Sequence, residues 1–384
     1  MELIRAAADG NIERVRTLMN QGVQVNARHK NGMTPLLAAA VTGHVDVVQA
    51  LLVQGADLKA RYRNEATVLI LAATQGEADV VELLLNRGAN PNEHAKEGST
   101  ALLAAAISGH AGAVKKLLKR GAEIDLADDN GVTPLLGSVI NGHAAVAALL
   151  LDSGANVNAR TKAGLSVSAA SATGSPDVLR TVLAHGGDAN ARDEHDRPAL
   201  VVAAANGMRE NVELLLAAGA GLEATTSDGT TAIIAAAVNG YKEIVEALAK
   251  QGADISAETD AGTTALLASV LRGHSEVAEF LLNAGAQVNR QNPSGVSALM
   301  AAASQNPGAV ELLLKHNADP SMADQDGVTA LMAAVISGHA DAVRALLAAG
   351  ADPKAETASG VNALQMAHAA DQLEIAELIR QVTE

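Results

Sequence analysis

The chain has 384 residues, a formal net charge of −15 and 48% apolar residues, yet only 1% of its residues are aromatic. It contains no cysteine, which excludes disulfide bonds, thiolate metal sites and cysteine nucleophiles. No stretch approaches the roughly 18 apolar residues of a membrane span, and Met1 leads directly into Glu2 and Arg5 instead of a signal-peptide core. We therefore expect an intracellular, cytoplasmic protein without membrane insertion.

Two series of glycines run through the chain with a period of 33 residues. The first extends from Gly10 to Gly273 and the second from Gly22 to Gly285. A fixed period of this length indicates a linear array of repeats. The scarcity of aromatic residues agrees, because a large globular core normally uses bulky rings to fill irregular space. The sequence therefore predicts a solenoid rather than one globular core.

Two of the repeats are one residue shorter than the others. One deletion falls in the repeat at 161–192, and the second falls in the repeat at 292–323, where Asn306 and Asn317 stand in for the two glycines. The repeat at 161–192 has lost a residue from its first helix, and its Ser and Thr residues have poor helix propensity. We therefore predict that it is the weakest repeat and a structural and functional divide.

Each repeat is predicted to form two antiparallel helices. In the second repeat, Thr34 is the expected N-cap and Pro35 the first helical residue, where its missing N–H costs nothing. Gly43 is expected to end this inner helix and Gly55 the following outer helix, because glycine tolerates a positive φ. The apolar face of the outer helix is expected to contain Val45, Val47, Val48, Leu51 and Leu52.

These motifs resemble the ankyrin repeat, whose consensus contains G-x-T-P-L-H-x-A-A-x-x-G-H, a V-x-x-L-L run and G-A-x-x-N. Residues 131–135, 141–143 and 154–158 match this consensus closely. The resemblance covers essentially the whole chain. One departure is systematic, because the family's His after T-P-L is apolar here, as at Leu37. This change removes a buried polar contact to the hairpin backbone.

The resemblance implies an all-α repeat solenoid of about twelve stacked ankyrin-type helix-turn-helix units joined by short β-hairpin-like loops. We expect a single ankyrin-repeat domain over residues 1–384, with an N-terminal cap at 1–28 and a C-terminal cap at 357–384. The repeats between the caps are expected at residues 29–61, 62–94, 95–127, 128–160, 161–192, 193–225, 226–258, 259–291, 292–323 and 324–356.

We expect no catalytic, cofactor or metal site, and therefore no enzyme. The histidines that follow repeat glycines are His44, His110, His143, His274 and His339. They lie at least one layer of roughly 10 Å apart, too far to share one metal ion, so we interpret them as structural caps. Gly219–Ala224 matches the loose dinucleotide pattern G-x-G-x-x-A, but no strand precedes it. The sequence contains no H-E-x-x-H, G-x-S-x-G or G-x-x-x-x-G-K motif.

In the ankyrin family, as the resemblance implies, partners bind in the concave groove formed by the hairpin tips and the exposed ends of the inner helices. Arginine and tyrosine are enriched at interface hot spots, and both occur on the first hairpins. We therefore predict that the partner-binding residues are Arg28, Lys30, Arg61, Tyr62, Arg63, Lys96, Ile107, Ile140, Arg160, Lys162 and Arg192.

The charge is distributed unevenly along the chain. Residues 1–192 hold 18 Lys and Arg against 18 Asp and Glu, whereas residues 193–384 hold 10 against 25. A neutral first half with a basic rim and an acidic second half favour a protein partner of complementary charge. The acidic half and the lack of interleaved aromatic residues argue against a nucleic-acid partner. We expect the protein to be a monomer.

Two classes of function remain open from the sequence. The first is a protein-protein interaction scaffold or adaptor that binds a partner which the sequence does not identify. The alternative is a regulatory ankyrin domain of a larger enzyme or channel, acting in cis. The reading frame distinguishes them, because a stop codon directly after Glu384 favours the first and continuation into another domain favours the second.

Overall fold

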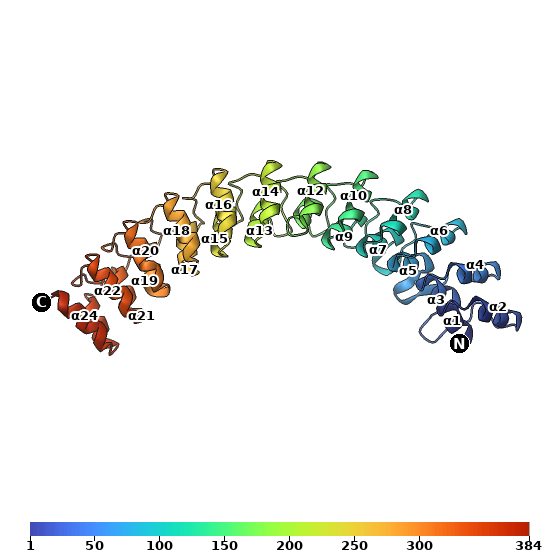
Figure 1. Ribbon diagram of the computed structural model, residues 1–384, viewed down its shortest axis with the longest axis horizontal. Coiled ribbons are helices and arrows are strands. Elements are labelled where there is room, and N and C mark those ends of the chain that lie inside the picture. Colours follow the sequence, from blue (N-terminus) through green and yellow to red (C-terminus); the bar gives the residue numbers. More distant parts are fainter. Residues whose placement is uncertain (384) are drawn as a thin grey trace. The chain divides into compact units, whose positions relative to one another are not determined.

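The computed structural model describes residues 1–383 as a series of helix pairs joined by short hairpins (Figure 1). The chain divides into two compact units, Met1–His195 and Asp196–Glu384. Within the described residues, each compact unit contains six helix pairs. We name the first helix of every pair the inner helix and the second the outer helix.

In the first compact unit, the inner helices pack side by side in one layer and the outer helices form a second layer. The inner helices are α1 (Glu2–Ala8), α3 (Pro35–Val41), α5 (Val68–Gln75), α7 (Ala101–Ile107), α9 (Pro134–Ile140) and α11 (Val167–Ser171). The outer helices are α2 (Ile12–Asn20), α4 (Val45–Val53), α6 (Ala78–Asn86), α8 (Ala111–Lys119), α10 (Ala144–Asp152) and α12 (Pro176–Ala184).

In the second compact unit, the inner helices again lie side by side, and each outer helix packs against its own inner helix. The inner helices are α13 (Ala199–Ala205), α15 (Ala232–Val238), α17 (Ala265–Leu271), α19 (Ala298–Gln305), α21 (Ala330–Ser337) and α23 (Ala363–Ala369). The outer helices are α14 (Arg209–Ala217), α16 (Lys242–Lys250), α18 (Ser275–Asn283), α20 (Val310–Lys315) preceded by η3 (Pro307–Ala309), α22 (Ala340–Ala348) and α24 (Leu373–Thr383).

Most inner helices begin at a hydroxyl side chain that caps them. The Oγ1 of Thr34 accepts a hydrogen bond of 3.3 Å from the N–H of Leu37, and Pro35 is the first helical residue. Equivalent Thr or Ser residues cap α5, α7, α9 and α11. In the second compact unit, Pro198 and Thr231 precede α13 and α15 without a side-chain cap bond. A missing cap lowers helix stability by about 1 kcal/mol.

The connections between helix pairs are short hairpins. Those with named elements are β1 (Arg61–Tyr62), η1 (Arg63–Glu65) and β2 (Ala66–Thr67) in one hairpin and η2 (Lys96–Gly98) in the next. Arg61 pairs with Thr67 in the antiparallel register of β1 and β2. Other hairpins have one antiparallel bridge, for example between Arg160 and Ser166. The second residue of these pairs directly precedes the next inner helix, as Thr67 precedes α5 and Ser166 precedes α11.

The core of the first compact unit lies between its two helix layers. Leu36, Leu51 and Leu84 are fully or almost fully buried, as are the small residues Ala39 and Ala40. The alanines let neighbouring inner helices approach closely, while the leucines fill the space between the layers. Full burial of a leucine side chain stabilises a protein by about 1.5–3 kcal/mol. Contacts between neighbouring repeats are therefore a main source of stability.

The prediction of an all-α repeat solenoid with about twelve helix pairs is confirmed. The shortened inner helix is also confirmed, because α11 has five residues whereas α9 has seven. Asn317 adopts the left-handed conformation of the glycine that it replaces, with a φ of 64°. Asn306 takes the position of a glycine but not its conformation, since its φ is −141°.

The predicted limits of the individual repeats, and the assignment of residues 1–384 to one domain, stay predictions. Within residues 1–383, no helix is both long and apolar enough to span a membrane.

Candidate functional site

The hairpin tips and the ends of the inner helices in the first compact unit form a surface that we name the inner face. Equivalent positions on its hairpins carry Lys30, Arg63, Lys96 and Lys162, which we name the tip row, with Asp129 between the last two. All five side chains are exposed. The N–H groups of Asp129 and Lys162 each donate to a carbonyl of the preceding tip, at 3.0 and 2.8 Å. Neighbouring tips therefore lie side by side.

The basic side chains of the tip row form no ion pair with a carboxylate among residues 1–383. The side chains of Lys30, Lys96 and Lys162 make no hydrogen bond or ion pair with the residues that the structure describes. The guanidinium of Arg63 lies 5.5 Å from the ring centre of Tyr62, which is a cation–π contact. Tyr62 itself is half-buried. The tip row thus presents four positive groups to a partner.

The predicted residues Arg28 and Arg61 join neighbouring hairpins. The Nε of Arg28 donates to the carbonyl of Gly32 in its own hairpin at 3.1 Å. Its Nη2 donates to the carbonyl of Arg61 in the next hairpin at 2.5 Å. Arg61 repeats this arrangement with the carbonyls of Glu65 and His94, at 2.7 and 3.1 Å. These bonds hold the hairpins in a chain that lacks the family's hairpin-bonding histidine.

The arginines at the bases of the hairpins differ in their exposure and further contacts. Besides its hydrogen bonds to carbonyls, Arg61 forms an ion pair with Glu93. Arg160 donates to the carbonyl of Gly164 in its own hairpin at 3.1 Å. Arg192 is half-buried in the last hairpin of the first compact unit. The tip row is therefore better exposed to a partner than Arg61 and Arg192.

Two predicted isoleucines add apolar surface to the inner face. Ile107 and Ile140 are the last residues of α7 and α9, and they are 39% and 50% exposed. A Cβ added to Gly137 would lie 2.8 Å from the Cγ1 of Ile107, so the glycine leaves room for this side chain against α9. An apolar centre with a charged rim is the usual composition of a protein interface.

An apolar pocket opens on the inner face between α1, α3 and the first hairpin. Its volume is about 330 Å³, and its lining residues are Met1, Ile4, Arg5, Ala8, His29, Asn31, Met33, Ala38, Val41 and Thr42. Sequence reasoning missed this pocket. Ala38 is one of its lining residues, and the next repeat has Leu71 at the equivalent position, four residues after the capping threonine.

The histidines that follow the repeat glycines bind the preceding repeat. The Nε2 of His110 lies 3.0 Å from the carbonyl oxygen of Thr74, near the end of α5. A carbonyl oxygen can only accept, so the ring nitrogen donates this bond. Equivalent bonds are made by His44, His143, His274 and His339. None of these side chains makes a cap bond in its own outer helix. Each instead binds a carbonyl at or near the end of the preceding inner helix, so the expected structural capping role is confirmed at that helix end.

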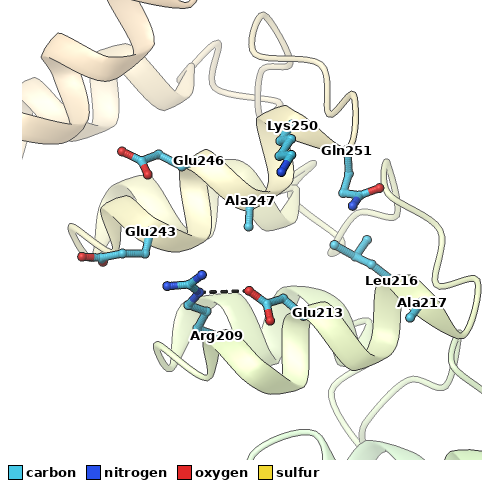
Figure 2. A pocket seen from close by; sticks show the side chains of 9 residues that line it. All are labelled: Arg209, Glu213, Leu216, Ala217, Glu243, Glu246, Ala247, Lys250 and Gln251. Carbon is cyan, nitrogen blue, oxygen red and sulfur yellow. Dashed lines mark hydrogen bonds and ion pairs between the residues drawn. The ribbon is translucent and has the colours of Figure 1, made fainter.

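A cleft lies on the outer helices of the second compact unit, between α14 and α16 (Figure 2). Its volume is about 420 Å³. Glu213 pairs with Arg209 of its own helix at 2.9 Å, and Ala247 points from α16 toward α14. In the first compact unit, the equivalent residues Glu82 and Lys116 form an ion pair between α6 and α8. The cleft is open because alanine takes the place of that lysine.

A second cleft with glutamate and alanine at these two positions occurs later in the second compact unit. A cleft of about 590 Å³ is lined by Glu311 and Ala345, which are separated in sequence by the same interval as Glu213 and Ala247. Arg344, which also lines this cleft, pairs with Asp341 of its own helix at 2.7 Å. Both clefts are open, and each contains an ion pair within one of its own helices, Arg209–Glu213 in the first and Arg344–Asp341 in the second.

The shifted pKa values of three carboxyl groups have local causes. The hydrogen bond from Lys116 lowers the pKa of Glu82. The hydroxyl of Thr226 lowers the pKa of Asp228, and that of Ser321 lowers the pKa of Asp319. These carboxyl groups belong to different repeats, so they do not form the paired acid and base of a catalytic site.

One group of potential metal ligands occurs among residues 1–383. Asp193, Glu194 and His195 are consecutive residues of one hairpin, and the last two are exposed. Exposed acidic groups of this kind are common without a metal ion.

Comparison with known protein families agrees with this geometry. The family profile described as Ankyrin repeats (3 copies) matches residues 3–95, 69–161, 167–259, 257–324 and 299–383. Ankyrin repeats generally act as protein-protein interaction modules and are typically not enzymes. No curated protein matches the chain. The repeated helix pairs, the capped inner helices and a profile match over nearly the whole length show that the chain belongs to the ankyrin-repeat family.

Proposed function

We propose that the chain is a scaffold or adaptor that binds a protein partner on the inner face of its first compact unit. The observation that carries this proposal is the tip row, a series of exposed basic side chains, together with the exposed apolar Ile107 and Ile140 at the ends of inner helices. A surface built on rigid repeats loses little conformational entropy when it binds, so modest contacts suffice for affinity.

The residues of the inner face have different roles in this proposal. Lys30, Lys96 and Lys162 attract the partner by charge, since they have no partner among the described residues. Tyr62 and Arg63 are the residue types that most often dominate interface energies. Arg28 and Arg61 hold neighbouring hairpins together by donating hydrogen bonds to main-chain carbonyls of the next hairpin.

The experiment compares two charge-matched variants of the full chain. In the first, Lys30, Arg63, Lys96 and Lys162 are replaced with serine. In the control, serine replaces four exposed basic residues of the outer helices and their ends, namely Arg87, Lys115, Lys119 and Arg120. Both variants lose the same charge, so a difference between them reports position rather than net charge.

Each protein is used to capture partners from a nuclease-treated native lysate, with quantification by mass spectrometry. We expect a set of proteins that the original chain and the control retain and that the tip-row variant loses by about tenfold or more. The amount of these proteins that the original chain captures should also fall with added salt, because salt screens the exposed charges of the tip row. Equal capture by all three proteins would exclude the inner face as the binding surface.

A regulatory role in cis, within a larger enzyme or channel, is the alternative hypothesis. Sequencing the transcript beyond the codon for Glu384 tests it directly.

A further inference from the structure

The apolar pocket of about 330 Å³ lies beside the first member of the tip row. Lys30 is flanked by His29 and Asn31, which both line the pocket. Arg5 lines its edge with a side chain that is 87% exposed. Arg5 therefore lies at the edge of the pocket and Lys30 lies between two of its lining residues, while Ile4 and other apolar side chains form its walls.

Few carboxylates oppose these basic groups. Asp9 pairs with Arg5 at 3.7 Å, and Glu65 is exposed on the second hairpin. Lys30 and Arg63 have no carboxylate partner within residues 1–383. A positive rim around an apolar cavity attracts an acidic ligand and repels a basic one.

We propose that this pocket binds a bulky aliphatic or aromatic side chain of an acidic partner segment, whose Asp and Glu residues contact Lys30 and Arg63. This proposal rests on the proposed function, because it assigns the partner to the same inner face. The volume is near the lower end of ordinary ligand pockets, which suits one large side chain. A single apolar anchor surrounded by weaker polar contacts is the usual arrangement of a binding hot spot.

The chain itself shows how to close the pocket without harming the fold. Ala38 lines the pocket, and Leu71 is the half-buried residue at the equivalent position of the next repeat. Ala38→Leu therefore introduces a side chain that the same fold already holds one repeat later. Ala145→Leu is the matched control, because Ala145 is exposed on the outer helix α10.

The experiment selects short random peptides by phage display on the full-length chain. Peptides that are enriched are synthesised with a fluorescent label, and their dissociation constants are measured by anisotropy. The proteins compared are the original chain, Ala38→Leu, Ala145→Leu and the double variant Lys30→Glu and Arg63→Glu. Circular dichroism checks that each variant is folded, and Ala38→Met replaces Ala38→Leu if the latter unfolds.

We expect the enriched peptides to contain a large apolar residue flanked by Asp or Glu. Ala38→Leu should weaken their binding by about tenfold or more, whereas Ala145→Leu should leave it unchanged. Replacing the apolar residue of a peptide with alanine should weaken binding to the original chain but not weaken binding to Ala38→Leu further. The charge variant should weaken binding as well.

Several results would overturn the proposal. These are enriched peptides that are basic or lack an apolar residue, equal affinity of the original chain and Ala38→Leu, or no enriched peptide at all. Loss of binding in the charge variant together with full binding to Ala38→Leu would reject the pocket and leave the proposed function intact. The lysate comparison with the tip-row variant tests that function separately.

Discussion

The Nε2 of His110 donates a hydrogen bond of 3.0 Å to the main-chain oxygen of Thr74, which joins two neighbouring repeats. The imidazole occupies the space beside Gly76, where an added Cβ would come within 2.5 Å of Nδ1. Gly76 also ends α5 with a φ of 81°. One glycine therefore provides both a left-handed backbone and room for the histidine of the next repeat.

Replacing Gly76 with alanine is expected to destabilise the chain more than replacing Gly88. Gly88 has a similar φ of 89°, but no atom lies within 4 Å of an added Cβ. A positive φ costs alanine about 1–2 kcal/mol, and the overlap with His110 adds about 1–3 kcal/mol. Urea denaturation followed by circular dichroism measures both changes. Equal losses of stability in the two variants would contradict the packing role of Gly76.

Stability is also expected to depend on pH through His185. Its Nδ1 lies 2.8 Å from the carbonyl of Thr181 and its Nε2 lies 3.1 Å from Asp152, so the protonated ring donates to both. The Thr181 carbonyl and then Asp152 raise the pKa of His185 above its ordinary value of 6.5. A pKa raised by folding means that this stabilisation is complete below pH 6.5 and is lost as the pH rises through the folded-state pKa.

The variant Asp152→Asn tests this pH dependence. It should bring the pKa of His185 closer to 6.5, as measured by NMR titration of the ring protons. The melting temperature of the variant should also fall less than that of the original chain as the pH rises above 6.5. An unchanged pKa of His185 in Asp152→Asn would show that the carboxylate does not contribute.

The cleft between α14 and α16 can be narrowed by introducing an ion pair. Ala247→Lys places an ammonium opposite Glu213, as Lys116 lies opposite Glu82. Because these positions are partly exposed, we expect a coupling energy of only about 0.2–1 kcal/mol. A double-mutant cycle with Glu213→Gln measures the coupling, which should shrink in high salt. A coupling of zero in low salt would refute the equivalence of the two positions.

Hydrogen exchange should identify the repeat at 161–192 as the least stable part of the array. Its inner helix α11 has only five residues, so it has fewer internal hydrogen bonds than the seven-residue α9 or α15. Amides of residues 165–185 are therefore expected to open at lower free energy than those of 133–151 or 231–250. Uniform protection across the three stretches would remove the proposed divide.

The fold could be predicted from the sequence because its signals are local and repeated. Thr34 and Pro35 mark the start of an inner helix, and Gly43 marks its end within a few residues. The short repeat was visible as a step of 32 instead of 33. Each signal depends only on neighbouring residues, and twelve repetitions reinforce it.

The candidate site could be predicted only in part, because it depends on which side chains meet between repeats. The exposed tips at Lys30 and Lys96 followed from the register of the repeat. The hydrogen bonds from Arg28 to backbone carbonyls could not be predicted in this way, because an arginine at the same position of the repeat could equally face solvent. The pocket beside Ala38 was missed for a similar reason, because it forms where side chains of α1, α3 and the first hairpin meet.

The hydrogen bonds between neighbouring repeats favour gene duplications that are one whole repeat in length. Arg28 binds the carbonyl of residue 61, and Arg61 binds that of residue 94, each 33 positions further on. The histidine bonds run 36 positions backward. Both intervals carry over when a gene duplicates or loses a segment of one whole repeat, since every donor then meets an equivalent acceptor. A duplicated segment of another length would shift many donors relative to their acceptors, whereas the one-residue deletions at 161–192 and 292–323 change the interval only locally. Duplication of a whole repeat is therefore the length change that keeps all of these bonds.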